Sequence, residues 1–151
     1  VLIGGDEDDT IIPGEGNNYI SGGGGSFNAL NGNVNGVNIY HIAEASGKTD
    51  LLPNFKPGVE YIHMPGYSFS DLDISSAGPD AIVSFGNDQQ ITLWSAAGKL
   101  TERDFIFTKE LPRDWPGPRA DVSIEEKRPQ PWVKKARRDP AAMRQEGRGA
   151  A

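Results

Sequence analysis

The feature that most constrains this 151-residue chain is a nine-residue spacing of apolar residues within its first 36 positions. Leu2, Ile11 and Ile20 are nine residues apart, and Ala29 or Leu30 lies at or beside the next position. A turn rich in glycine and Asp or Asn precedes Ile11, Ile20 and the position at 29–30. Such nonapeptides are typical of parallel solenoids whose acidic glycine turns bind calcium. The ten glycines of residues 1–36 argue against a helix, because each interior glycine costs roughly 1 kcal/mol.

Residues 37–107 have a different pattern, with short strands every 8–12 residues separated by turn residues, which indicates an all-β unit. Alternating apolar and polar residues predict strands at 37–42 and 60–64. Residues 81–85 and 90–94 flank the turn 86–88 and predict a β-hairpin. We therefore expect an all-β fold: a short parallel β-roll of nonapeptide repeats at 1–36, and its continuation with an antiparallel cap at 37–107.

Residues 108–151 form the third segment, which we expect to be an extended, irregular tail. It carries six prolines and few large apolar residues, so it cannot bury a core of its own. Residues 136–148 could form a short basic helix. Trp115 and Trp132, each beside a proline, are the expected anchors, packing either on this domain or on a partner.

Charge divides the chain as well. Residues 1–108 hold 14 acidic and four basic residues (−10), whereas residues 109–151 hold seven acidic and 11 basic ones (+4), which together give the net −6. The acidic part can concentrate cations, and the basic part can meet an acidic surface. For the tail we therefore expect a protein partner or sister subunit ahead of nucleic acid or anionic lipid, with a solvated tail as the alternative. No apolar run is long enough for a membrane span.

With these segments in place, the chain resembles the hemolysin-type (RTX) calcium-binding repeat proteins exported by type I secretion. The resemblance covers residues 1–107 and is carried most firmly by the closing segments. Residues 49–62 (TDLLPNFKPGVEYI) contain the Phe-x-Pro-Gly motif with an acidic residue before Ile, and residues 100–107 (LTERDFIF) resemble the terminal Asp-Phe-hydrophobic-Phe signature. The 44 residues after Phe107 depart from the family pattern.

The resemblance implies Ca²⁺ ions held between stacked turns, each bound by six to eight oxygen ligands. Because successive turns alternate sides, turn 4–9 should stack on turn 22–27, and turn 13–18 on turn 31–36. Asp9 is then the main carboxylate ligand, supported by carbonyls near Gly4 and Gly22 and by the charge of neighbouring acids. The candidate metal-binding residues are Gly4, Asp6, Asp8, Asp9, Gly22, Gly24, Asn18 and Asn28.

Within that set, Asn28 replaces the acidic residue of the third turn after a one-residue shift. Asn18 belongs to a weaker site on the opposite edge, with Glu15 and residues 33–35. The alternative is a metal-free roll, in which asparagine amides close the turns without an ion.

Catalytic motifs are not evident in the sequence. His41 and His63 lie outside any zinc-protease pattern, and we expect both to be surface or cross-strand residues. A carboxylate pair drawn from Asp71, Asp73 and Asp80 is better explained by solvated loop edges. Cysteine is absent, which excludes thiolate chemistry and disulfides.

The sequence therefore favours a non-enzymatic calcium-binding structural module of a secreted or surface protein, extracellular or periplasmic, which supports folding and assembly outside the cell. One alternative is an accessory subunit of a larger complex, anchored through the basic tail. Another is the C-terminal module of a secreted enzyme or of a glycan-binding protein, for which Tyr40, Tyr61, Tyr67 and Trp94 are the candidate aromatics.

Overall fold

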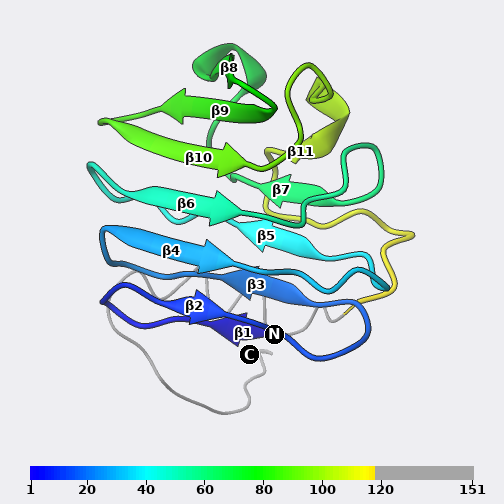
Figure 1. Ribbon diagram of the computed structural model, residues 1–151. Helices are drawn as coiled ribbons and strands as arrows, with labels where there is room; N and C mark the ends of the chain where they lie inside the picture. Colours follow the sequence, from blue (N-terminus) through cyan, green and yellow to red (C-terminus); the bar gives the residue numbers. More distant parts are fainter. Residues whose placement is uncertain (118–151) are drawn as a thin grey trace. The chain divides into compact units, whose positions relative to one another are not determined.

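The computed structural model describes residues 1–117, which form two β-sheets with only two single-turn 3₁₀ helices (Figure 1). The all-β prediction is confirmed. Trp132 and residues 136–148 lie outside the described residues, so the expectations placed on them stay predictions. Within the described part of the chain, no helix is long and apolar enough to cross a lipid bilayer.

Sheet A contains five strands, and every neighbouring pair in it is parallel. In order across the sheet they are β1 (Leu2–Ile3), β3 (Tyr19–Ser21), β5 (Ile39–His41), β7 (Tyr61–His63) and β11 (Phe105–Ile106).

Sheet B has six strands, of which the first four are parallel and the last three form an antiparallel meander. They are β2 (Thr10–Ile11), β4 (Phe27–Leu30), β6 (Thr49–Leu52), β10 (Gln89–Leu93), β9 (Asp80–Phe85) and β8 (Asp73–Ala77). The 3₁₀ helices are η1 (Phe69–Asp71) and η2 (Glu102–Asp104).

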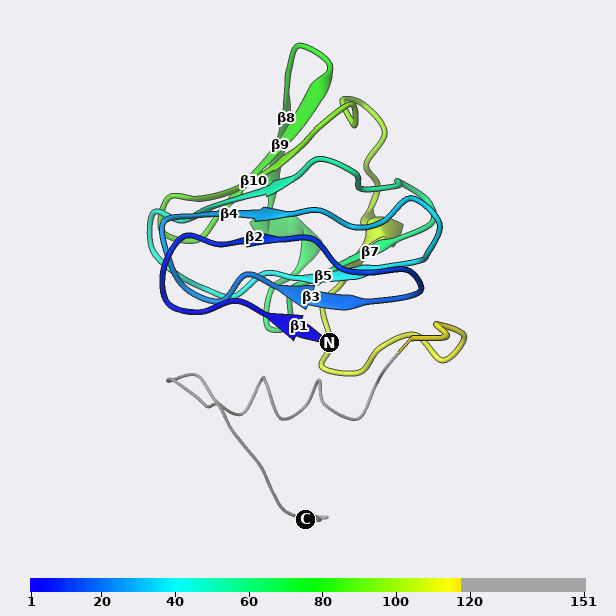
Figure 2. The ribbon, with the colours of Figure 1, turned by 60° about the horizontal axis from the view of Figure 1, so that its bottom comes forward.

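From β1 to β7 the chain alternates between the two sheets, so consecutive strands lie in different layers, and strands two apart in sequence are hydrogen-bonded neighbours (Figure 2). The register shows how far the nine-residue spacing extends. Leu2 pairs with Ile20, Ile20 with Tyr40, and Tyr40 with Ile62, which are separations of 18, 20 and 22 residues. We call the stretch of chain from one strand of sheet A to the next a coil. Each coil is longer than the one before, and only the first has the length of two nonapeptides.

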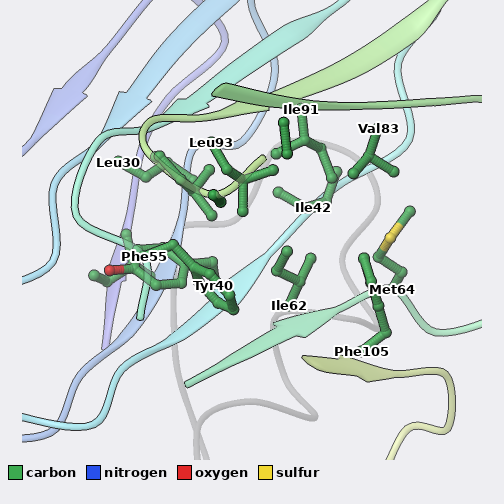
Figure 3. Packing of buried hydrophobic residues seen from close by; sticks show 14 of the residues in the cluster. Leu30, Tyr40, Ile42, Phe55, Ile62, Met64, Val83, Ile91, Leu93 and Phe105 are labelled. Carbon is green, nitrogen blue, oxygen red and sulfur yellow. The ribbon is translucent and has the colours of Figure 1, made fainter. Parts of the chain in front are cut away.

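The apolar positions of the spacing meet in the space between the sheets. Ile11 pairs with Leu30, and Leu30 is fully buried whereas Ala29 is only partly so, which makes Leu30 the next core residue. Figure 3 shows the core deeper in the molecule, where Tyr40 and Ile62 of sheet A lie opposite Leu93 and Ile91 of sheet B. Burial of these side chains supplies most of the driving force for folding, at roughly 25 cal/mol per Å² of apolar surface.

The predicted hairpin is confirmed, because β9 and β10 are antiparallel with Val83 opposite Ile91. Strand β8 was not predicted: its sequence, Asp-Ile-Ser-Ser-Ala, is largely exposed and pairs along one edge of β9. Its polar composition fits this exposure, because a strand whose side chains face solvent has no core to fill, and polar residues on an edge strand disfavour pairing with another chain.

Candidate cation-binding site

The turns between strands form two stacks, one at each edge of the paired sheets. We call residues 4–9, 22–26 and 43–48, which lead into β2, β4 and β6, the first turn stack. Residues 13–18, 31–38 and 53–60, which lead into β3, β5 and β7, are the second turn stack. Each stack has a first gap, between its first two turns, and a second gap, between its last two.

The expected stacking of the turns is visible in their hydrogen bonds. Gly24 N donates to Gly5 O at 2.9 Å in the first stack, and Val37 N donates to Asn17 Oδ1 at 2.7 Å in the second. Because these bonds join residues about 19 or 20 positions apart, they fix each turn onto the next coil.

Side-chain oxygens near the start of a strand accept hydrogen bonds from backbone N–H groups of the coil before it, once in the first stack and twice in the second. In the first stack, Asn28 Oδ1 accepts a hydrogen bond of 2.9 Å from Asp9 N. The second stack repeats this arrangement twice: Asn38 Oδ1 accepts from Asn18 N at 3.1 Å, and Glu60 Oε2 accepts from Asn38 N at 2.9 Å. The acidic and amide positions of the turns therefore satisfy backbone donors of the preceding coil.

The first gap of the first stack contains the predicted calcium residues. Asp9 Oδ2 accepts from Gly5 N at 2.8 Å and so folds its own turn. Asp8 reaches across the gap, where its Oδ1 accepts from Ser26 N at 2.7 Å and from Phe27 N at 2.9 Å. Asp8 therefore does more than add charge, since it closes the two turns on each other.

Oxygen atoms converge beside Gly4 in that gap. A Cβ added at Gly4 would lie 2.5 Å from the Gly22 carbonyl oxygen and 2.6 Å from Asp9 Oδ2. A Cβ added at Gly23 would meet the carbonyl oxygens of Gly5 and Gly4, at 2.5 and 2.8 Å. We call the oxygens beside Gly4 and Gly23 the cradle, and only glycine fits at these two positions without a clash. One carboxylate and several carbonyls are the kind of oxygen donors that a hard cation such as Ca²⁺ prefers.

The second gap of the first stack differs, because Lys48 fills it. Its Nζ donates to Gly23 O at 3.2 Å and lies 3.3 Å from Asp50 Oδ2. Both side chains are 1% exposed. Neither carboxylate oxygen of Asp50 has a well-aligned hydrogen bond, so the nearby ammonium charge is its main compensation. Burial raises the pKa of Asp50, and Lys48 opposes that rise.

The first gap of the second stack is filled by amides. Asn33 Nδ2 donates to the carbonyl oxygens of Gly14 and Gly16, both at 2.9 Å. Asn18 Nδ2 donates to the same two oxygens at 3.2 Å. The weaker calcium site expected around Asn18 is therefore occupied by the amide donors that the metal-free alternative describes.

The second gap of the second stack again contains a lysine. Lys56 Nζ donates to three carbonyl oxygens of the neighbouring turn, those of Asn33 (3.2 Å), Val34 (3.1 Å) and Gly36, and lies 3.4 Å from Glu60 Oε2. Glu60 is fully buried and also accepts from Asn38 Nδ2 at 2.8 Å. Burial raises the pKa of Glu60, while the hydrogen bonds from Asn38 and the charge of Lys56 lower it.

The structure thus places most of the predicted metal residues together, with two exceptions. Gly4, Asp8, Asp9, Gly22, Gly24 and Asn28 lie at the first gap of the first stack, where Asn28 Nδ2 donates to Gly24 O at 2.7 Å. Asp6 is exposed, with its backbone beside Gly24, and Asn18 lies in the other stack. In residues 1–117, no three acidic or histidine side chains gather around one point, so a cation here would rely on carbonyls.

The sequence predicted that the two histidines are surface or cross-strand residues, and the structure shows the second arrangement, with both side chains buried. His41 is 7% exposed and His63 is fully buried, and they are in register on neighbouring strands, as a cross-strand pair. Tyr19 Oη lies 2.8 Å from His63 Nδ1, and His63 Nε2 lies 2.7 Å from the Thr108 carbonyl oxygen. Both histidines are buried because they lie in a parallel sheet whose residues are buried on both faces.

The three aspartates considered as a catalytic pair have separate structural contacts. Asp71 lies in η1, where its Oδ2 accepts from Ser68 N at 2.8 Å. Asp73 begins β8, and Asp80 Oδ1 accepts from Ser95 N at 2.9 Å. Ser95 has a positive φ of 61°, a conformation that its N–H hydrogen bond to Asp80 Oδ1 helps to hold.

Of the aromatic residues considered for glycan binding, Tyr40 is excluded, because it is fully buried in the core. Trp94 is 49% exposed.

The chain was compared with protein-family models and with curated proteins. No family model matches it, and no curated protein matches it.

Proposed function

We propose that this chain is a non-enzymatic, calcium-binding structural module, built as an RTX-like β-roll of nonapeptide origin with an antiparallel cap. The proposal is supported by the alternation of parallel strands between two layers and by the sequence motifs at 49–62 and 100–107. In this proposal the bound metal stabilises the folded conformation of the first coil.

The observation that carries this proposal is the oxygen cradle beside Gly4. The Asp9 carboxylate and the Gly22 carbonyl oxygen lie so close to Gly4 that a Cβ there would clash with both, and the Gly4 and Gly5 carbonyl oxygens lie equally close to Gly23. The other three gaps have ammonium or amide groups that donate across them, from Lys48, Lys56 and Asn33. In the first gap of the first stack the side-chain amide is that of Asn28, and its hydrogen bond goes to Gly24 O within its own turn, not to the oxygens beside Gly4. The first gap of the first stack is therefore the place where an external cation adds most, with water completing its coordination.

Electrostatics gives the ion a role in folding. Residues 6–9 place four acidic side chains on one exposed turn, and the first 36 residues contain no lysine or arginine to neutralise them. A bound Ca²⁺ removes this repulsion, so binding and folding of the first coil are coupled. Outside a cell, where calcium is abundant, the first coil is ordered. At low calcium it is loose, which is compatible with export.

A calcium titration of the whole chain tests the proposal. We expect Ca²⁺ to raise the Tm and to slow amide hydrogen exchange in residues 1–36 more than in residues 50–107. The control is Asp9→Asn, which removes the charge but keeps the shape and should abolish most of the response. Equal exchange with and without calcium in the unmodified chain would contradict the proposal.

A further inference from the structure

Lysines occupy the second gap of both turn stacks, where the Lys48 side chain is 1% exposed and the Lys56 side chain is 29% exposed. Residues 1–108 contain only four basic residues, and two of them, Lys48 and Lys56, hold these equivalent positions. Lys48 Nζ contacts one backbone carbonyl of the preceding turn and Lys56 Nζ contacts three. Each also lies beside a buried carboxylate of its own coil, Asp50 or Glu60. Carbonyls with a carboxylate are also the ligand set found in the first gap beside Asp9.

We propose that Lys48 and Lys56 are built-in cations, and that the oxygen atoms around each form a Ca²⁺ site once the ammonium group is removed. In the native chain the lysines make the later coils independent of metal. The inference goes beyond the calcium site proposed for the first gap and does not depend on it.

The Lys56 position makes the stronger case. Three carbonyl oxygens and Glu60 Oε2 surround one Nζ, from residues 33, 34 and 36 on one turn and residue 60 on the next. An ammonium group has three protons to donate, and here it faces four oxygens, so the site has more acceptors than the lysine can fully satisfy. Calcium accepts six to eight such ligands in flexible geometry, so it can use all four and add water.

The Lys48 position provides independent support. Asp50 is 1% exposed, and its two carboxylate oxygens lack aligned hydrogen-bond donors. A buried carboxylate in that state needs a neighbouring positive charge, because an unpaired ion in the interior is strongly destabilising. Lys48 supplies this charge from 3.3 Å, through a side chain that is itself 1% exposed. A divalent ion in the same gap would meet the same need.

The experiment compares Lys56→Ala with Lys56→Met in an Asp9→Asn background, so that the first gap does not contribute to the response. Alanine opens the gap, whereas methionine removes the charge but keeps most of the side-chain volume. We expect both variants to lose on the order of 10 °C in Tm without metal. At about 10 mM CaCl₂, a concentration suited to weak sites, Lys56→Ala should regain at least half of that loss and Lys56→Met should regain little.

Lys48→Ala is the parallel test, and Lys99→Ala, at an exposed position, is the control that neither loses stability nor responds to calcium. Sodium chloride of equal ionic strength should not replace calcium in any variant. The proposal is overturned if the alanine variants show no calcium response, if they stay unfolded by circular dichroism at that calcium concentration, or if the methionine variant recovers equally. Because the Asp9 site is disabled throughout, these outcomes are separate from those of the first-gap titration.

Discussion

The indole Nε1 of Trp115 donates a hydrogen bond of 2.8 Å to the carbonyl oxygen of Val37, which lies 78 residues earlier in the chain. Trp115 is 3% exposed, although it lies beyond the last strand. The sequence-based expectation that this tryptophan packs on its own domain or on a partner is therefore resolved in favour of its own domain. The bond ties the segment after β11 to the turn that precedes β5.

Replacing Trp115 should reveal how much this contact contributes. Trp115→Phe removes the hydrogen bond and part of the ring, and we expect it to cost about 1 kcal/mol from the bond alone. Trp115→Ala should cost about 3–5 kcal/mol, as for other buried aromatic truncations. Urea unfolding measures both. Trp94→Phe, at a residue that is 49% exposed, is the control and should stay within about 0.5 kcal/mol. Equal losses at the two tryptophans would contradict this assignment.

Glycine at position 4 should be essential for the cradle, whereas its neighbour should not be. Gly4→Ala places a Cβ against Gly22 O and Asp9 Oδ2, so we expect it to block calcium binding and to destabilise the first coil by about 1–3 kcal/mol. Gly5→Ala is the matched control, because a Cβ there would meet nothing within 4 Å. Isothermal titration with Ca²⁺ compares the two. Full calcium binding by Gly4→Ala would locate the ion elsewhere.

The buried Glu60 should make stability depend on pH in a defined direction. Burial raises its folded pKa above the ordinary value of 4.5, so the folded chain keeps this proton at a higher pH than the unfolded chain does. The stabilisation from the protonated form is therefore present below about pH 4.5 and is lost as the pH rises through the raised folded pKa.

Glu60→Gln isolates this effect, because glutamine does not titrate and all other titratable groups are the same in the unmodified chain and the variant. The difference in unfolding free energy, unmodified chain minus variant, should decrease as the pH rises from about 4 to 7. Urea denaturation at several pH values provides the measurement. A difference that increases over this range would show that Lys56 and Asn38 outweigh burial.

His63 should carry its proton on a defined nitrogen. The Thr108 carbonyl only accepts hydrogen bonds, so Nε2, at 2.7 Å from it, must be the donor. In the neutral ring Nδ1 then accepts from Tyr19 Oη. Nitrogen-15 NMR of the imidazole is expected to report the Nε2–H tautomer, and Tyr19→Phe should leave it unchanged while shifting the Nδ1 resonance. A dominant Nδ1–H form would contradict the contact with Thr108.

Sequence patterns predicted those parts of the fold that depend on interactions between residues close together in the chain. The hairpin of β9 and β10 follows from alternating residues around a three-residue turn, and both strands were placed correctly within a residue or two. The spacing of Leu2, Ile11 and Ile20 predicted which residues face the core at the start of the chain. Asp9 was singled out by its place in the first nonapeptide, and the structure places its carboxylate in the first gap, where Oδ2 accepts from Gly5 N; its role as a metal ligand stays a prediction.

The roles of Lys48 and Lys56 could not be predicted in the same way, because they depend on the register between coils. Lys48 contacts Gly23, 25 residues away, and Lys56 contacts Asn33, 23 residues away. Neither separation is a multiple of nine, since the coils lengthen from 18 to 20 to 22 residues. When the turn stacked on it is not known, a single lysine in an acidic chain is interpreted as a solvated surface charge.

The long interval between β7 and β11 has a consequence for the order of folding. Ile62 pairs with Phe105, 43 residues later, and β8, β9 and β10 lie between them. Closing a loop of that length is entropically costly until the local hairpin has shortened it. We therefore expect the β9–β10 hairpin to form early and the first coil to join last. High φ-values at Val83 and Ile91, with values near zero at Ile11, would establish that direction of growth.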